Sequence, residues 1–285
     1  MNLSVRGKRR LKAAVTNGIM IVIMVFYLLP FWYVVNNAFK ERSYISLQPF
    51  TINLDIFTLD NIISAFSKMN YPVAFFNSFS VLVISCLIFI LLGSMTAYGI
   101  YIADHKFFNR LYVLFVALIA LPFQAAMVPL VTLLRTLHLS DNFFGLALIY
   151  SAMFMPFIVF LYTGFMRSLP KELMESARID GCSEARIFFQ MVLPMSRPIV
   201  VYTVISSFLV PWMDFVYAKM ILNAGISSKY TVAIGLYKML DKSLINSYFT
   251  QFCAGGVLVS VPISILFMIM QKFYVEGITG GAVKG

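Results

Sequence analysis

Long runs of apolar residues, separated by short charged segments, dominate the pattern along this chain. Five runs contain no Asp, Glu, Lys or Arg, and they lie between residues 12 and 40, 68 and 104, 110 and 135, 141 and 167, and 242 and 272. A sixth run, from Pro198 to Ala218, is interrupted only by Asp214. Each run supplies the roughly 20 apolar residues that a membrane-spanning helix needs.

The pattern therefore predicts an all-α, polytopic membrane protein with six transmembrane helices. Backbone polar groups in hydrocarbon must be bonded within their own segment, and the alternating strands of a membrane barrel are missing from the sequence. The composition agrees, because 60% of the residues are hydrophobic and only 12% are charged, whereas a soluble domain carries about 25% charged residues. The predicted helices cover Val15–Phe39, Phe75–Ile102, Leu111–Leu134, Phe143–Phe165, Ile199–Leu222 and Gln251–Phe273. A short surface helix is expected just after Thr58.

A basic segment before the first helix sets the expected orientation. It carries Arg6, Lys8, Arg9, Arg10 and Lys12. The run that follows is too long for a signal peptide and lacks a small-residue cleavage site, so we interpret it as a retained helix. By the positive-inside rule, the N-terminus and, after six helices, the C-terminus are expected in the cytoplasm. The net charge of +10 is then explained by topology and requires no nucleic acid.

One charged segment, Glu175–Pro194, stands between two apolar runs, and this order places it in the cytoplasm. Ser168 is a candidate N-cap for a first short helix, which Gly181 would end in the left-handed conformation. Ser183 is a candidate cap for a second helix that would end before Pro194. Two short helices joined by a tight glycine turn would form a rigid projection, which can pass on a partner's movement.

This segment resembles the Glu-Ala-Ala loop of ATP-binding-cassette importer permeases. The residues that match the pattern are Glu175, Ala177, Asp180, Gly181, Leu193 and Pro194. The sequence departs from the pattern at Ser176, Cys182 and Met191. The replacements are small or apolar, and the spacing is kept. The resemblance identifies residues 166–198 as a coupling loop within a single permease domain, residues 1–285.

Motifs along most of the chain resemble the smaller membrane subunit of carbohydrate importers of the maltose-transporter type. They begin at Leu29 (Leu-Pro-Phe-Trp-Tyr), Leu121 (Leu-Pro-Phe-Gln-Ala-Ala), Trp212 (Trp-Met-Asp-Phe), Tyr230 (Tyr-Thr-Val-Ala-Ile-Gly-Leu) and Phe273, where the terminal segment starts. Met213 departs from the Asn that the family usually has between the Trp and the acid. The resemblance implies the fold of a type I ATP-binding-cassette importer permease, and import of a di- or oligosaccharide by alternating access.

The resemblance also implies partners and roles for particular residues. The partners are a second homologous permease, two ATPase subunits that bind ATP and magnesium, an extracytoplasmic solute-binding protein and the sugar. In the coupling loop, Glu175 is expected to accept hydrogen bonds from a basic ATPase group. The other residues that the resemblance assigns to coupling are Ser176, Ala177, Asp180 and Gly181. The C-terminal tail is expected at the ATPase interface, through Gly280, Gly281 and Lys284. This tail is too glycine-rich for us to expect a stable helix there.

The sequence contains no Gly-x-x-x-x-Gly-Lys-Ser/Thr motif, so this chain is not expected to bind or hydrolyse ATP itself. Asp214 is the only acid within a predicted span, which makes it a candidate for the substrate path. Pairing with water or a backbone group near the interface is the alternative for Asp214. Trp212 would either stack on a sugar or anchor its helix.

Two other classes of protein are alternatives to the importer. An ion-coupled secondary transporter without an ATPase is expected to carry several intramembrane carboxylates, and one is too few. A membrane enzyme needs clustered catalytic groups, whereas His105 and His138 are predicted on opposite membrane sides. The Cys spacing indicates no metal site.

Overall fold

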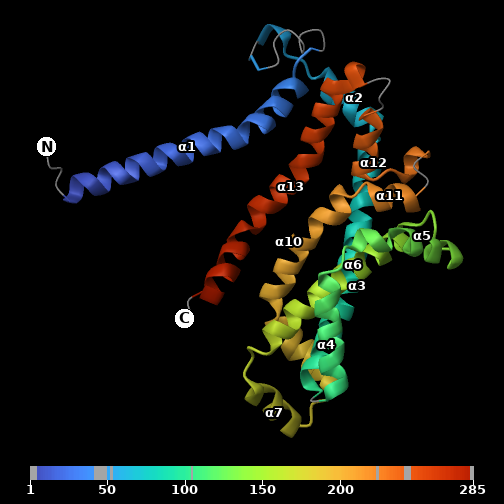
Figure 1. Ribbon diagram of the computed structural model, residues 1–285. Helices are drawn as coiled ribbons and strands as arrows, with labels where there is room; N and C mark the ends of the chain where they lie inside the picture. Colours follow the sequence, from blue (N-terminus) through green and yellow to red (C-terminus); the bar gives the residue numbers. More distant parts are fainter. Residues whose placement is uncertain are drawn as a thin grey trace. The chain divides into compact units, whose positions relative to one another are not determined.

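The computed structural model describes residues 5–41, 50–51, 54–103, 105–222, 225–240 and 245–282 (Figure 1). These ranges are helical apart from turns and one isolated β-bridge between Lys40 and Phe57, which confirms the all-α prediction. The helices form two compact units, which are described separately. The first comprises Met1–Lys68 and Lys238–Ser260, and the second Met69–Tyr237 and Val261–Gly285.

The first unit joins the N-terminal helix to the start of the last helix. Its elements are α1 (Val5–Ala38), η2 (Leu54–Ile56), α2 (Asp60–Lys68), η6 (Lys238–Leu240) and the beginning of α13 (Ile245–Ala282). The predicted surface helix is α2, and the Thr58 hydroxyl accepts a hydrogen bond from the Asp60 N–H at 3.1 Å. The Asn61 amide donates to the carbonyls of Ala38 and Lys40 at 3.1 and 2.8 Å. These two bonds fix the end of α1 against α2.

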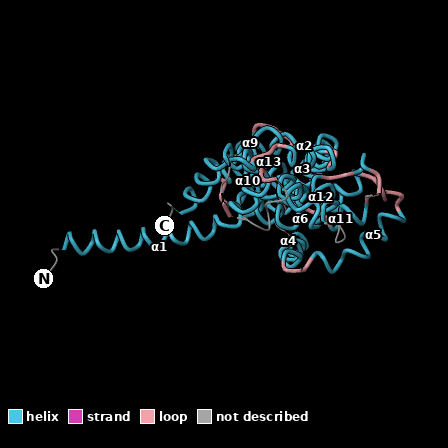
Figure 2. The backbone as a smooth tube through the Cα atoms, turned by 90° about the horizontal axis from the view of Figure 1, so that it is seen from above, coloured by secondary structure: helices cyan, strands magenta, loops and turns pink. Residues whose placement is uncertain are grey.

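The second unit contains the remaining helices (Figure 1 and Figure 2). They are α3 (Tyr71–Ile102), α4 (Lys106–Ile119), η3 (Phe123–Ala126), α5 (Met127–Thr136), α6 (Phe143–Met166), α7 (Lys171–Ile179), α8 (Glu184–Ile187), η4 (Phe188–Val192), α9 (Leu193–Met195), α10 (Arg197–Met213), α11 (Val216–Ile221), η5 (Ser227–Lys229), α12 (Val232–Tyr237) and the end of α13. η4 is a single turn of π-helix.

Four helices in the described ranges are long and apolar enough to cross a membrane unaided. They are Lys12–Ala38, Tyr71–Ile102, Phe143–Met166 and Phe249–Gln271. Two further spans are bent pairs, Lys106–Ile119 with Phe123–Thr136 and Glu184–Met195 with Arg197–Met213. The number of spans reaches the predicted six if each bent pair is counted as one. The second pair differs from the predicted span, because it joins the last part of the coupling loop to α10 through a 69° bend at Ser196.

The span predicted over Leu111–Leu134 is broken near its middle. α4 ends at Ile119 and the chain bends by 96° before α5. Pro122 lies at the break, where its ring disfavours helix in the preceding residue and its nitrogen cannot donate a backbone bond. The Tyr217 hydroxyl donates to the Phe123 carbonyl at 3.0 Å, so a side chain satisfies one of the groups at the break.

The span predicted over Ile199–Leu222 is also interrupted, because α10 ends at Met213. Asp214 adopts an extended backbone conformation, and its carboxylate accepts hydrogen bonds from the N–H groups of Val216 at 3.2 Å and Ala218 at 3.0 Å. An Asp side chain that binds nearby amides competes with helix continuation and starts a new helix instead. The acid therefore marks the end of one helix and the start of α11.

The last helix is longer than predicted. The sequence suggested an end near Phe273 and a non-helical glycine-rich tail, whereas α13 continues to Ala282 and includes Gly280 and Gly281. Each glycine lowers the stability of a helix by about 1 kcal/mol relative to alanine. α13 nevertheless continues through both glycines. Lys284 lies outside the described residues.

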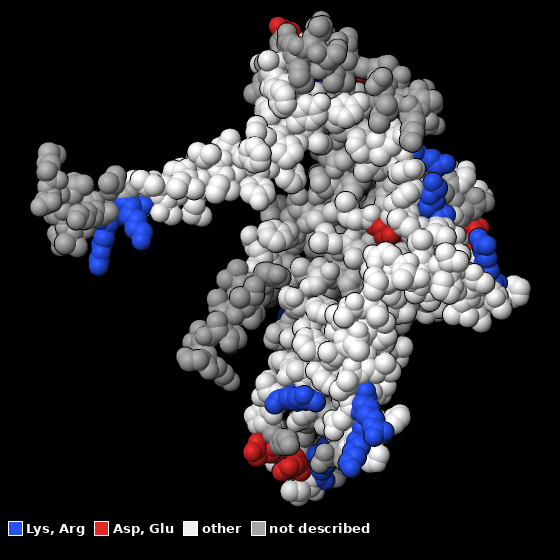
Figure 3. All heavy atoms as spheres, viewed as in Figure 1, with Lys and Arg blue, Asp and Glu red and all other residues white. Residues whose placement is uncertain are grey.

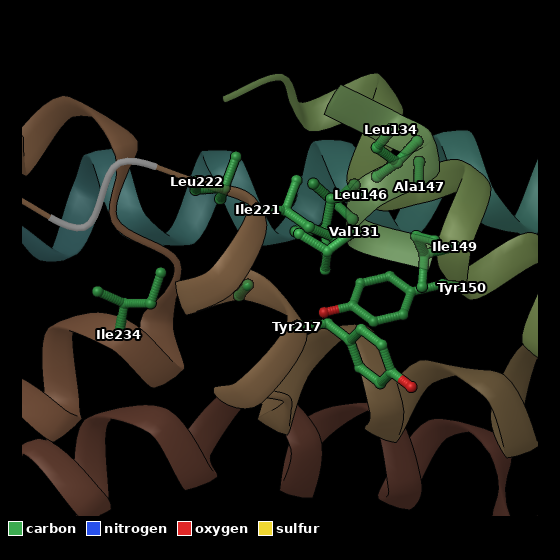
Figure 4. Close-up of a cluster of buried hydrophobic side chains, with 12 residues drawn as sticks. Val131, Leu134, Leu146, Ala147, Ile149, Tyr150, Tyr217, Ile221, Leu222 and Ile234 are labelled. Atoms are coloured by element: carbon green, nitrogen blue, oxygen red, sulfur yellow. The ribbon is translucent and has the colours of Figure 1, made fainter. Parts of the chain in front are cut away.

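α3 and α6 pack closely and form the centre of the second unit. Gly93 of α3 permits the approach, since a Cβ there would lie 2.6 Å from Cγ2 of Ile158 on α6. A buried apolar cluster continues from α6 to α5 and α11, where side chains such as Val131, Leu146 and Ile221 point towards one another (Figure 4). This core holds both broken spans against α6.

Two glycines of α6 give a matched test of this packing. We predict that Gly145→Ala lowers the stability of the purified chain by about 1–3 kcal/mol, because a Cβ at Gly145 would clash with the rigid backbone carbonyl of Leu139. Gly164→Ala is the control, since nothing lies within 4 Å of a Cβ at that position. Thermal unfolding in detergent measures both variants, and equal midpoints would contradict the predicted clash.

Candidate functional site

The predicted coupling loop folds into short helices, the first of which is the largely exposed α7. Met174 and Ala177 face inward, with 4% and 8% of their surfaces exposed. Leu173 and Ile179 face outward and are 43% and 87% exposed. α7 therefore has a buried apolar face and two further apolar side chains that nothing in the described chain covers. Ala177, which the resemblance assigns to coupling, packs against its own chain.

The turn after α7 has the conformation that the sequence predicted. Gly181 has a φ of +80°. The Gly181 N–H donates to the Arg178 carbonyl and the Cys182 N–H to the Ala177 carbonyl, both at 3.0 Å. These two bonds define a Schellman motif, which ends a helix at a left-handed residue. A Cβ at Gly181 would have nothing within 4 Å, so the need for glycine here is conformational and not steric.

The caps of the two loop helices agree only in part with prediction. Ser183 caps α8 by accepting a hydrogen bond from the Arg186 N–H at 3.3 Å. Ser168 does not cap α7, because its hydroxyl donates to the Phe165 carbonyl and the cap position is Pro170. The second helix does not stop before Pro194 either. It passes through the π-turn and ends at Met195, with Pro194 in the first turn of α9, where its missing N–H costs little.

An ion pair joins the two helices of the loop. Nε of Arg178 lies 2.6 Å from Oε1 of Glu184, and both side chains are roughly 40–45% exposed. This hydrogen bond raises the pKa of the Arg178 guanidinium, so the pair remains charged. Exposed pairs of this kind contribute only about 0–1 kcal/mol to stability, so its effect is on geometry more than on the free energy of folding.

A largely polar cavity of about 410 Å³ lies behind α7. The end of α3, the start of α4 and α7 line it, and its polar members include Asn109, Arg167, Glu175 and Arg178. Arg167 is held over the ring of Tyr112, with 4.9 Å between its guanidinium carbon and the ring centroid. Glu175 itself is exposed, as are Ser176 and Asp180. The loop therefore brings the predicted Glu175, Ser176, Asp180 and Gly181 together at one end of the second unit.

The two intramembrane candidates lie away from this loop. Trp212 is fully buried, with its ring centroid 5.4 Å from those of Phe75 and Phe208. Asp214 accepts a hydrogen bond from the Tyr150 hydroxyl at 2.7 Å, besides the two backbone N–H groups of α11. Both side chains are engaged in packing and hydrogen bonding within the chain.

A second cavity, of about 760 Å³, was not foreseen from the sequence. It lies at the broken span and is lined by residues 118–119 and 121–126, by part of α6 and by Val210. Most of the lining is apolar, and Gln124 is its polar side chain. Pro122 within an uncharged run was the available signal, because a proline can end a helix and free backbone groups.

The family comparison matches residues 89–280 to binding-protein-dependent transport system inner membrane components. The chain belongs to this family. It is therefore a multi-pass plasma-membrane protein and a permease component, not an enzyme. The matched range includes both broken spans and the whole coupling loop.

Named relatives agree with the family assignment. The permease is 36% identical over 67% of each chain to the galactooligosaccharides transport system permease protein of Bacillus subtilis. It is 34% identical over 80% of each chain to the arabinooligosaccharides transport system permease protein of Halalkalibacterium halodurans. Identity to the maltodextrin transport system permease protein of Streptococcus pneumoniae is 27% over the full length of both.

The permease also has the fold of a chain whose structure has been solved by experiment. A chain of a bacterial ABC transporter involved in the import of the acidic polysaccharide alginate matches it with a TM-score of 0.81. The match covers 96% of the permease and 100% of that chain, at 17% identity. At this identity the likeness supports the fold alone, and it confirms the predicted importer-permease fold.

Sequence reasoning did not single out Ile179, the most exposed large apolar side chain of the described residues. Ile179 stands between Arg178 and Asp180. An apolar residue flanked by charged ones at the end of a short predicted helix was the available signal.

A pair of neighbouring residues tests whether Trp212 packs the core of the permease. We predict that Trp212→Ala lowers stability by about 3 kcal/mol or more, since it removes a fully buried ring and leaves a cavity. Met213→Ala is the control, because Met213 is 54% exposed. Thermal unfolding in detergent gives both values. A Trp212→Ala midpoint as high as that of Met213→Ala would contradict the packing role.

Proposed function

We propose that this permease is one of two homologous membrane subunits of an ATP-driven importer for a di- or oligosaccharide. Two ATPase subunits, which bind ATP and magnesium, and an extracytoplasmic solute-binding protein complete the complex. The relatives named for galactooligosaccharides, arabinooligosaccharides and maltodextrin support the class of substrate. A related solved complex contains a periplasmic protein with bound alginate pentasaccharide, which supports a binding-protein partner.

The observation that carries the proposal is the uncovered face of α7. Ile179 is the most exposed large apolar side chain described, and Leu173 of the same helix, which is expected to face the cytoplasm, is also exposed. Glu172, Glu175 and Asp180 belong to the same short segment, and charged side chains gather at this end of the second unit (Figure 3). An apolar centre with an acidic rim fits a partner with an apolar cleft and basic edges.

Within this surface, each residue of the loop has its own role. Glu175 accepts charge-assisted hydrogen bonds from a basic ATPase group. Ser176 is small and exposed and allows close approach of the ATPase. Gly181 sets the turn after α7, and Asp180 is the residue just before this glycine. ATP binding closes the ATPase subunits, α7 moves with them, and the two permeases open outward to accept sugar. Hydrolysis returns them to the inward-facing state, with the N- and C-termini in the cytoplasm.

The substrate path is proposed to run beside the break at Asp214. The buried indole of Trp212 and the bonded carboxylate of Asp214 favour a structural role in the conformation described. Direct sugar contact by either residue requires the α10–α11 break to open during transport. Gln124, exposed in the cavity at the other broken span, is a polar group that would be costly in lipid and suits a water-filled path.

The α7 surface is tested by paired substitutions in the assembled complex. We predict that Ile179→Asp and Glu175→Lys abolish sugar uptake and weaken co-purification with the ATPase subunits, while membrane insertion is retained. Ile63→Asp is the control, because Ile63 is an equally apolar exposed side chain on α2.

Gly181 is tested separately with the same uptake assay. Gly181→Val should also abolish uptake, since a β-branched residue at φ +80° is strained by about 1–2 kcal/mol. Gly181→Asn should retain more activity, because Asn tolerates the left-handed conformation. Normal uptake by Ile179→Asp, Glu175→Lys and Gly181→Val, at normal expression, would overturn the assignment of this loop to coupling.

The C-terminus carries a further prediction of the proposed function. Gly280, Gly281 and Lys284 are proposed to contact the ATPase subunits, and the backbone of α13 reaches Ala282. Removal of residues 279–285 should lower uptake or raise the ATP hydrolysed per sugar, without preventing assembly. Proteoliposome assays of uptake and hydrolysis test this, and wild-type rates of both would show that the tail is dispensable.

A further inference from the structure

One side chain of α3 contacts two residues at the start of the second helix of the coupling loop, Glu184 and Phe188. The Tyr98 hydroxyl donates a hydrogen bond to Oε2 of Glu184 at 2.5 Å. The Tyr98 ring lies 5.4 Å from the ring of Phe188, centroid to centroid. Glu184 and Phe188 are four residues apart and therefore lie on the same helical face. Tyr98 thus holds this face by an apolar contact and a polar one.

The Glu184 carboxylate also reaches back to α7. Nε of Arg178 donates to its Oε1 at 2.6 Å, and Nη2 of Arg178 donates to Oε2 at 3.3 Å. Such a two-pronged bond between guanidinium and carboxylate fixes orientation as well as distance. A single carboxylate therefore joins α8 to α7, from which a turn separates it, and to α3, which is distant in the sequence.

The surroundings explain why this junction matters for α7. Tyr98 is 5% exposed, so its hydroxyl is held in place by packing. Behind α7, by contrast, the cavity of about 410 Å³ separates part of the helix from the ends of α3 and α4. Close packing supports α7 there only through the buried Met174 and Ala177. The bonds that run through Arg178 and Glu184 to Tyr98 add a directional restraint against a tilt of α7 into the cavity.

We propose that Glu184 is a positioning residue that locks the coupling loop to α3, with Arg178 and Tyr98 as its two partners. The inference rests on the proposed function and deepens it. With the lock intact, a push on α7 moves α3 and the helices packed on it. Without the lock, α7 tilts into the cavity, and ATP is hydrolysed without the matching movement of the membrane helices.

The test measures the ATP hydrolysed per sugar imported by the complete complex in proteoliposomes. Tyr98→Phe removes only the hydroxyl, and Glu184→Gln removes the charge at nearly constant shape. Both should raise the ratio several-fold, and the double variant should raise it no further than the stronger single one. Tyr101→Phe is the matched control, since Tyr101 is a tyrosine of the same helix that lines the same cavity.

A purely structural role predicts a different result. In that case uptake and hydrolysis fall in proportion, the ratio stays constant, and the lock is overturned. Exchange of the two charges, Arg178→Glu with Glu184→Arg, should restore part of the coupling that either single change removes. Failure of the exchanged pair to improve on the single variants would also count against the lock.

A measurement without transport separates this inference from the proposed function. Spin labels are placed at the half-buried Thr96 and the exposed Glu172 after replacement of Cys86, Cys182 and Cys253. The distance distribution between the labels should be narrow, and Glu184→Gln should broaden it. Equal widths would overturn the lock. Absence of uptake by the unaltered complex, with broadening still observed, would contradict only the proposed function.

Discussion

The constraint on which the rest of this permease depends is that every backbone polar group in the membrane must find a partner. Two spans are broken, and each break frees N–H and carbonyl groups that lipid cannot satisfy. The Asp214 carboxylate accepts from the amides of Val216 and Ala218, and the Tyr217 hydroxyl donates to the Phe123 carbonyl. These bonds allow irregular backbone next to the cavity at the first break and connect the two breaks through α11.

The polar side chains at the breaks depend in turn on the apolar core of the second unit. Tyr150 donates to Asp214 from α6, and its ring is buried in the cluster formed by α5, α6 and α11. α6 packs on α3, where Gly93 allows the helices to approach. Because α6 packs on α3 and also contacts α5 and α11, a movement of α3 would displace the residues at both breaks. This arrangement gives a physical route from the coupling-loop end of α3 to the two breaks.

Much of this fold follows from the sequence, because apolar length and helix caps are local properties. The positions of the spans, the turn at Gly181 and the cap at Ser183 could all be predicted. The breaks could not, since proline alone does not decide them. Pro30, Pro156 and Pro262 lie inside continuous helices, whereas a helix ends just before Pro122. The hydrogen bond between Tyr98 and Glu184 could not be predicted from the sequence either, because the two residues are 86 positions apart and only the tertiary structure brings them together.

The coupling loop combines two physical requirements that usually conflict. In the proposed function, its outer face binds the ATPase partner, for which the exposed Ile179 is suited, and its inner face has to be stiff enough to transmit force. Burial of Met174 and Ala177 alone is a small contact, and the polar cavity behind α7 limits further packing. Directional bonds supply stiffness where packing is incomplete, because a hydrogen-bonded carboxylate resists rotation as well as separation. Glu184 and Asp214 therefore play similar structural parts. The Glu184 carboxylate bonds to α3 and α7, and the Asp214 carboxylate bonds to α6 and α11. Each carboxylate holds an irregular segment in one geometry.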